Sequence, residues 1–246
     1  EAVSAADAAV IVVSFSVSYF SYWRGGISIK EVFSDIIVEA PLGSRTKLTL
    51  PDGTLVWLNA GSRITYSQGF GVGNRKIELI GEGYFEVKRN EEVPFLVKTN
   101  SLLVKVLGTK FNFRDYPDDA EAIVSLSEGK VALNNLLKKE KEAFLLPNER
   151  VVLNKKNGRM HVEYSTVSNA LQWTNGYLFF DEELLPDVVK ELERSYNVKI
   201  QIASDTLNTF RFYGNFVHRE QNIQEVLEAL SATRKIHYII EGHNIT

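Results

Sequence analysis

Short runs of alternating apolar and polar residues follow one another from about Pro41 to Leu153, and they constrain the fold more than any other feature. Each run has the length and alternation of a β-strand with one buried face. Turn residues separate the runs, and no long helix fits between them. The segment is therefore predicted to be an all-β domain, either a sandwich, a barrel or a β-solenoid. The runs are Lys47–Leu50, Leu55–Leu58, Lys76–Leu79, Tyr84–Val87, Leu102–Val106, Ala122–Leu126 and Lys130–Leu133.

A repeat follows the all-β segment. Residues 185–192 (LPDVVKEL) match residues 223–230 (IQEVLEAL), 38 positions later. Each predicted helix follows an aromatic strand and precedes a second strand. Asn222 and Glu225 have the spacing of a capping box at the start of the second helix. The chain therefore ends in a predicted duplicated β-α-β unit, with strands expected at Tyr177–Phe180, Val198–Ile202, Phe210–Val217 and Ile236–Ile240.

An uncharged apolar run, Ala8–Trp23, precedes both segments. As a helix it would span roughly 24 Å, slightly less than a hydrocarbon core of about 30 Å. Tyr19, Tyr22 and Trp23 lie at its C-terminal end, as residues at a membrane interface do. The run is predicted to be a transmembrane helix. A buried core helix and a signal peptide are the alternatives, although the basic region and cleavage site of a signal peptide are not visible.

These features predict a mixed β and α+β chain in five parts. They are a transmembrane segment (residues 1–23), a linker (24–40), an all-β domain (41–155), a second linker (156–172) and the duplicated unit (173–246). Because the sequence starts with Glu1 rather than Met and ends within an apparent strand at Thr246, we expect the natural chain to extend beyond both ends.

The charge and the cysteine content narrow the classes of function. The formal net charge is −3 and the pI is about 5.9, which gives no indication of a polyanion partner such as nucleic acid. Cysteine is absent. Disulfides, thiolate metal sites and a cysteine nucleophile are therefore excluded together.

Few residue clusters suggest chemistry. Gly69–Gly73 leads into a strand rather than a helix, so we interpret it as a hairpin loop and not as a phosphate site. The four histidines lack the helical spacing of a zinc site, and we expect no metal and no cofactor. Asp118, Asp119 and Glu121 are interpreted as a solvated loop, because paired catalytic carboxylates face each other across a cleft.

Aromatic residues are concentrated on the strands of the repeat. Most are expected in the core, but strand alternation directs about half of them outward unless both faces are covered. A partner-facing aromatic patch is therefore the alternative. Its candidate partner-binding residues are Tyr177, Phe179, Phe212 and Phe216.

Five stretches, taken in order, resemble the FecR family of anti-sigma regulators. They are residues 50–62 (LPDGTLVWLNAGS), 79–87 (LIGEGYFEV), 94–97 (PFLV), 106–112 (VLGTKFN) and 126–131 (LSEGKV). The duplicated unit resembles the small STN-type domain of secretins and TonB-dependent receptors. Together the two resemblances cover nearly everything after the apolar run.

The resemblance implies a function. FecR-like regulators hold an extracytoplasmic-function sigma factor with a cytoplasmic domain and cross the inner membrane once. They receive a signal in the periplasm from a TonB-dependent outer-membrane transporter. This chain would be the extracytoplasmic part of such an anti-sigma regulator, with residues 24–246 in the periplasm. Its partners would be the transporter's signalling domain, the inner membrane and, through a cytoplasmic domain outside this sequence, the sigma factor. No enzyme activity on an external substrate is expected.

The dipeptide Gly108-Thr109 has two interpretations. One is a β-bulge or tight turn, in which glycine supplies a backbone conformation that other residues resist. The other follows from the resemblance, because some FecR-like regulators break their own chain at this Gly-Thr bond. The threonine hydroxyl would then attack the glycine carbonyl. Glu82, Glu86 and Glu128 are the candidate bases, and the sequence favours none of them.

Two other classes of function stay open. A β-helical carbohydrate-active or carbohydrate-binding periplasmic protein would need a carboxylate pair or a metal cluster in the β-domain, and the sequence shows no convincing one. A secretin component would need a long pore-forming domain, for which too little chain remains. The five ordered stretches favour the regulator.

Overall fold

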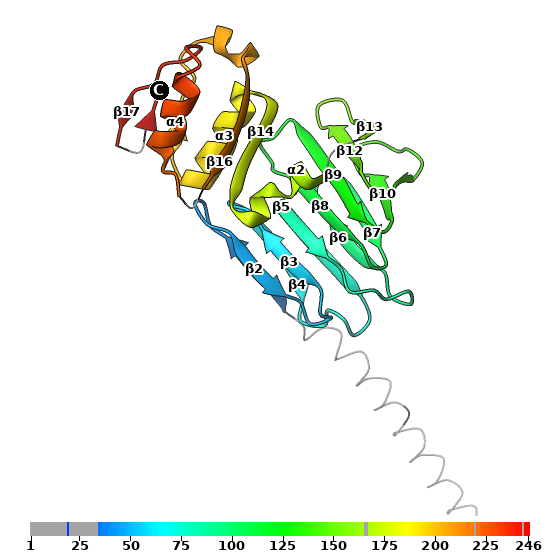
Figure 1. Cartoon of the computed structure of the whole chain (residues 1–246). Helices are drawn as coiled ribbons and strands as arrows, with labels where there is room; N and C mark the ends of the chain where they lie inside the picture. Colours follow the sequence, from blue (N-terminus) through cyan, green and yellow to red (C-terminus); the bar gives the residue numbers. More distant parts are fainter. Residues whose placement is uncertain (1–18, 20–33, 165–166, 219, 243) are drawn as a thin grey trace, which may run out of the picture.

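The computed structural model describes residues 19, 34–164, 167–218, 220–242 and 244–246. It places a large β-domain before a smaller C-terminal unit of helices and short strands (Figure 1). The strands of the β-domain are β1 (Asp35–Ala40), β2 (Thr46–Thr49), β3 (Leu55–Leu58), β4 (Ser62–Ser67), β5 (Arg75–Glu86), β6 (Phe95–Lys98), β7 (Leu102–Val106), β8 (Lys110–Asp115), β9 (Glu121–Glu128), β10 (Val131–Asn135), β11 (Ala143–Leu145), β12 (Glu149–Asn154) and β13 (Arg159–Tyr164).

The C-terminal unit follows β13 directly. Its elements are α2 (Val167–Ala170), the 3-10 helix η1 (Gln172–Asn175), β14 (Tyr177–Leu184), α3 (Leu185–Tyr196), β15 (Lys199–Ile200), the 3-10 helix η2 (Asp205–Thr209), β16 (Arg211–Val217), α4 (Ile223–Ser231), β17 (Ile240–Glu241) and β18 (Asn244–Ile245). The order β-α-β therefore occurs twice, as the repeat predicted.

The β-domain is one continuous sheet that folds over on itself at β5. The N-terminal half of β5 pairs with β4 and β6, and its C-terminal half pairs with β3 and β8. Sheet A therefore has the order β1-β4-β5-β6-β7-β10-β11, and sheet B has the order β2-β3-β5-β8-β9-β12-β13. The two halves enclose one core, which agrees with the predicted all-β, sandwich-like domain.

The corner in β5 depends on a glycine. Gly81 has φ +96°, a left-handed conformation that side chains rarely adopt. A Cβ at Gly81 would lie 2.5 Å from the Ser62 Oγ, so there is also no space for one. Beyond the corner, alternate residues of β5 point into the core from sheet B instead of sheet A. The family-like stretch at residues 79–87 is thus the bend that joins the two sheets.

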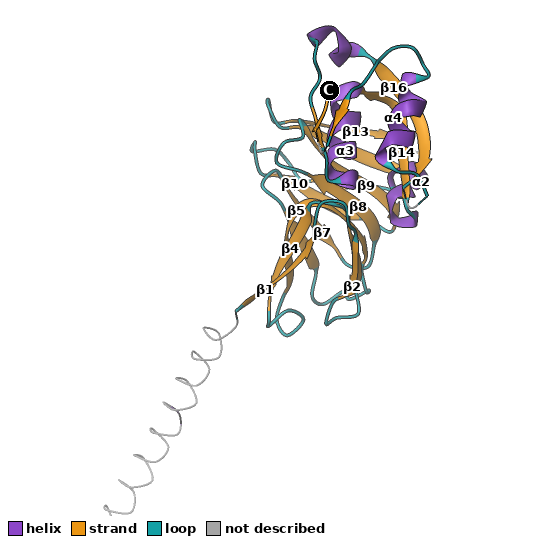
Figure 2. Ribbon diagram, turned by 90° about the vertical axis from the view of Figure 1, so that its left-hand side faces the viewer, coloured by secondary structure: helices purple, strands orange, loops and turns teal. Residues whose placement is uncertain are grey.

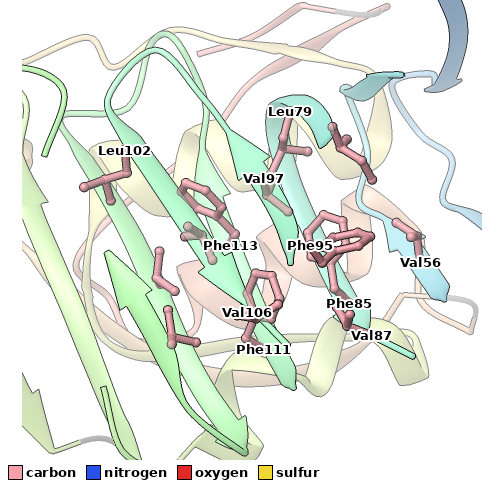
Figure 3. Close-up of a cluster of buried hydrophobic side chains, with 14 of the residues drawn as sticks. Val56, Leu79, Phe85, Val87, Phe95, Val97, Leu102, Val106, Phe111 and Phe113 are labelled. Carbon is pink, nitrogen blue, oxygen red and sulfur yellow. The ribbon is translucent and has the colours of Figure 1, made fainter. Parts of the chain in front are cut away.

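Aromatic and aliphatic side chains from both sheets fill the core (Figure 3). The rings of Phe85 and Phe111 are stacked at 5.1 Å between centroids, and Phe95 of sheet A meets Phe85 edge-on at 6.1 Å. All three side chains are fully buried. Burial of side chains this large supplies most of the favourable free energy of folding.

In the C-terminal unit, the first strands of the two repeats pair with each other, whereas the strand after α3 pairs with β18, which also pairs with β17. β14 pairs antiparallel with β16, and β15 pairs parallel with β18. The capping box at Asn222 is confirmed, since its side chain accepts from the Glu225 N–H and the Glu225 carboxylate accepts from the Asn222 N–H. The last predicted strand was misplaced: the structure has Ile240–Glu241 instead of Ile236–Ile240. Ile236 is buried in the core without strand pairing.

The two segments interpreted as linkers contain strands. β1 lies within residues 24–40 and pairs with β4, and β13 lies within residues 156–172 and pairs with β12. The β-domain therefore extends to both sides of the predicted range. Within the part of the chain that the structure describes, no helix is long and apolar enough to cross a bilayer. Apart from Tyr19, the predicted transmembrane run Ala8–Trp23 lies outside the described residues.

Candidate functional site at the domain junction

Helix α3 belongs to the core of the C-terminal unit and also packs against the β-domain. Its apolar residues Leu185, Val188, Val189 and Leu192 are buried in the C-terminal core. Glu191, Arg194 and Ser195 are buried as well, on the side that meets the β-domain. The C-terminal unit lies at one end of the β-domain, beyond the ends of β2 and β3 (Figure 1).

Two arginines and two carboxylates alternate across this junction. Asp119, in the turn after β8, accepts from Arg114 at 2.8 Å and from Arg194 at 3.0 Å. Glu191 lies 3.5 Å from Arg114 and 3.3 Å from Arg194. Each domain thus contributes one cation and one anion, and the four formal charges cancel. Asp119, Glu191 and Arg194 are buried and Arg114 is half-buried, and charges with so little access to water are stable only when they are paired.

The pKa values reflect this pairing. Burial alone would raise the pKa of Asp119 and of Glu191, but the neighbouring charges of Arg114 and Arg194 lower both below their ordinary values. Burial would lower the pKa of Arg194, and Glu191 and Asp119 together raise it instead. All three groups are therefore charged at neutral pH.

A third buried carboxylate, Glu82, lies at the corner of β5. It accepts hydrogen bonds from the Asn59 amide at 2.9 Å and from the Asn112 amide at 2.7 Å. Burial raises the pKa of Glu82, against the lowering effect of Arg114. The indole N–H of Trp173, in η1, donates to the Asn112 side-chain oxygen at 3.2 Å. A polar chain therefore runs from the bend of the β-domain to the start of the C-terminal unit.

Tyr116 and Gly43 complete the junction. The Arg194 guanidinium lies over the Tyr116 ring, 4.0 Å from its centroid, which is a close cation–π contact. The Tyr116 hydroxyl donates to the Ala60 carbonyl at 2.9 Å. The Gly43 N–H, just after β1, donates to the Arg194 carbonyl at 2.8 Å. Helix α3 is thus fixed to the β-domain through both its side chains and its backbone.

This site was not predicted from the sequence. Asp119 was assigned to a solvated loop, yet it is only 8% exposed and forms ion pairs with Arg114, Lys190 and Arg194. Its partner Arg194 is 75 residues away in the sequence, so no local spacing connects them. Among the described residues, no three His, Cys, Asp or Glu side chains are placed to hold a metal ion.

The structure gives Gly108 and Thr109 a defined place between β7 and β8. The Thr109 hydroxyl is buried and donates to the Lys130 carbonyl at 3.1 Å. Gly108 does not have a left-handed φ, so a special backbone conformation is not what requires glycine there. A Cβ at Gly108 would lie 2.7 Å from the Arg89 Cβ, so close approach of the two chains requires it. The register between β8 and β9 shifts directly afterwards, since Lys110 pairs with Glu128 and Phe111 with Leu126.

The three candidate bases have other partners. Glu82 is held by Asn59 and Asn112, Glu86 accepts from the Tyr84 hydroxyl at 3.3 Å, and Glu128 pairs with Lys110 at 2.9 Å. The hydrogen bond that the Thr109 hydroxyl donates goes to a backbone carbonyl, not to a glutamate.

The four candidate partner-binding aromatics separate into two pairs. Phe212 and Phe216 are 2% and 6% exposed and belong to the C-terminal core, so their side chains are not on the surface. Tyr177 and Phe179 are half-buried on the opposite face of the β14–β16 ribbon. Tyr213, which was not selected, is 62% exposed on β16. The aromatic residues on the outward face of the β14–β16 ribbon are therefore Tyr177, Phe179 and Tyr213.

The chain is therefore a two-domain protein, in which charged residues join a folded-over β-domain to a duplicated β-α-β unit. Residues 37–132 match the family model described as FecR protein, and residues 177–246 match the one described as FecR, C-terminal. The chain belongs to the FecR family of anti-sigma factors.

Solved structures agree with this assignment. A crystal structure at 1.65 Å of a Parabacteroides distasonis protein assigned as an anti-sigma factor is 33% identical, with a TM-score of 0.79. The match covers 85% of this chain and 97% of that chain. A second crystal structure with the same description, at 2.50 Å, is 32% identical, with a TM-score of 0.79 and coverage of 86% and 97%. No curated protein sequence matches the chain.

Proposed function

We propose that this chain is the extracytoplasmic receiver of an anti-sigma regulator and relays a signal from a TonB-dependent outer-membrane transporter to a sigma factor. The observation that supports this most strongly is the junction of Arg114, Asp119, Glu191 and Arg194. Because these charges pair across the two domains, a force that a partner applies to the C-terminal unit is transmitted to the β-domain. A pair of domains joined by a flexible linker would not transmit force in this way.

The proposed topology follows from the order of the chain. Ala8–Trp23 anchors the protein in the inner membrane, and residues 24–246 lie in the periplasm. The sigma factor is held by a cytoplasmic domain that precedes this sequence. A reporter enzyme fused after Thr246 should be active in the periplasm, and cytoplasmic activity would exclude this topology.

The transporter's periplasmic signalling domain is proposed to bind the outward face of the β14–β16 ribbon. Among the described residues, both strands pair only with each other, so each has an edge that can accept a partner strand. Tyr177, Phe179 and Tyr213 lie on that face and are the kind of residue that anchors interfaces.

Replacing Tyr213 with aspartate is expected to weaken binding of the signalling domain about tenfold or more, because it removes an aromatic anchor and introduces a charge. Tyr164→Asp is the matched control, since Tyr164 is 86% exposed on β13 of the β-domain. Titration calorimetry with the purified signalling domain measures both. Equal effects of the two substitutions, or an effect of Tyr164→Asp alone, would move the binding site to the β-domain.

We also retain self-cleavage between Gly108 and Thr109 as part of the proposal. The Thr109 hydroxyl would attack the Gly108 carbonyl, and the peptide nitrogen would leave as an amine. The resulting ester would then be hydrolysed by water. Purified wild-type chain should yield fragments 1–108 and 109–246 in denaturing mass spectrometry. Thr109→Ser should retain some cleavage, and Thr109→Ala should stay intact. If the wild-type chain is still intact after long incubation, unassisted cleavage is excluded and Gly108-Thr109 has a structural role alone.

A further inference from the structure

The outer face of sheet A carries two rows of side chains that the strand registers define. One row crosses five strands through Lys76, Leu96, Lys105, Ala132 and Phe144. The neighbouring row crosses six strands through Ile37, Thr65, Glu78, Lys98, Leu103 and Asn134. All of them are exposed or half-buried, whereas their sequence neighbours on these strands are mostly buried in the core.

The charges on this face are mainly positive. Lys76, Lys98 and Lys105 are exposed, and none forms a salt bridge with another described residue. Lys130 adds a fourth ammonium group, 4.7 Å from the centroid of the Phe144 ring. Glu78 is the one carboxylate within the two rows. Asp35, Glu39 and Arg63 lie on the same side of β1 and β4, so five cations against three carboxylates give the face a formal charge of +2, although the chain as a whole carries −3.

Apolar side chains lie between these lysines. Leu96 separates Lys76 from Lys105, which lie two strands apart, or about 10 Å. Phe144 is 51% exposed at the β11 end of the face and Ile37 is 58% exposed at the β1 end. Basic residues interleaved with leucine, isoleucine and phenylalanine are typical of surfaces that lie on anionic lipid headgroups.

The chain order keeps this face near the proposed membrane anchor. β1 is an edge strand of sheet A, and residues 24–34 connect it to the end of the apolar run. Eleven residues reach at most roughly 40 Å when fully extended. Helices α2 and α4 lie on the side of β8 and β9, away from β4 and β10 (Figure 2).

We infer that the outer face of sheet A lies against the anionic surface of the membrane in which the chain is anchored. The inference rests on the proposed anchor but goes beyond it, because it assigns an orientation to the β-domain. Lys76, Lys98, Lys105 and Lys130 contact phospholipid headgroups, while Phe144 and Ile37 reach the boundary of the acyl chains. The C-terminal unit, on another side of the β-domain, stays accessible to a partner.

The absence of cysteine allows this to be tested with single labels. The full chain is reconstituted in vesicles of phosphatidylethanolamine and phosphatidylglycerol, with headgroup spin-labelled lipid as quencher. A fluorophore is placed at Asn134→Cys on the face or at Glu228→Cys on α4. We expect strong quenching at position 134 and little at position 228. The charge-reversed chain K76E/K98E/K105E should lose the quenching at position 134. Loss of the three lysine–headgroup contacts alone weakens binding of the face to the membrane on the order of a hundredfold.

A matched control reverses three exposed lysines elsewhere, as K47E/K156E/K199E, with the same change in net charge. It should retain the quenching at position 134. If the chain floats with the vesicles but quenching at 134 equals that at 228, or is the same in phosphatidylcholine vesicles, the face does not contact lipid and the anchor still stands. If the chain does not float with the vesicles, anchor and inference both fail. Quenching unchanged by K76E/K98E/K105E, with signalling-domain binding lost, would assign the face to a protein and overturn the inference.

Discussion

Replacing Arg194 with methionine is expected to lower the free energy of unfolding by about 3–5 kcal/mol, because it leaves Asp119 and Glu191 buried with less compensating charge. Both carboxylates have Arg194 within 3.3 Å. Urea denaturation followed by tryptophan fluorescence measures the change, and Trp173 at the junction is one of the reporters. The double variant Asp119→Ala/Arg194→Met should lower the free energy of unfolding by about 0.5–3 kcal/mol less than the two single substitutions added together.

The control for this prediction is Arg63→Met. Arg63 pairs with Glu39 at 3.5 Å, but both side chains are substantially exposed, at 45% and 60%. Its loss should cost no more than about 1 kcal/mol. Equal costs for the two arginines would mean that the junction behaves as an ordinary surface pair and does not fix the domains.

Replacing Gly81 with alanine is expected to destabilise the chain by about 2–5 kcal/mol, combining left-handed strain with a clash against Ser62. Gly53→Ala is a matched control, because Gly53 has φ +85° but nothing within 4 Å of its added Cβ. It should cost only about 1–2 kcal/mol, from strain alone. Thermal or chemical denaturation of both variants measures the difference. If Gly53→Ala destabilised the chain as much as Gly81→Ala, the lack of space at the β5 corner would not contribute to the destabilisation.

Much of the fold could be predicted because the signals are local. Alternating runs bounded by turns indicated the β-domain, and the repeat at Leu185 and Ile223 indicated the duplicated unit. β13 was missed because an edge strand with one neighbour buries little, and its sequence lacks a clean apolar face. Ile236 was placed in a strand because it is apolar, although it packs into the core without pairing.

The junction could not be predicted, because its contacts join residues far apart in the sequence. Nothing near Asp119 indicates that Arg194 will cover it. The aromatic strands show the same limit. Alternation divides Tyr177 and Phe179 from Leu178 and Phe180, but only the packing of the helices decides which set faces inward.

We expect the buried junction to hold the two domains as one body. Distance measurement by electron spin resonance tests it, with spin labels at Asn100→Cys in the β-domain and Glu228→Cys in the C-terminal unit, both at exposed positions. A single narrow distance distribution is expected, and it should become broad when Arg194→Met is added. A broad distribution in the chain with Arg194 intact would contradict it.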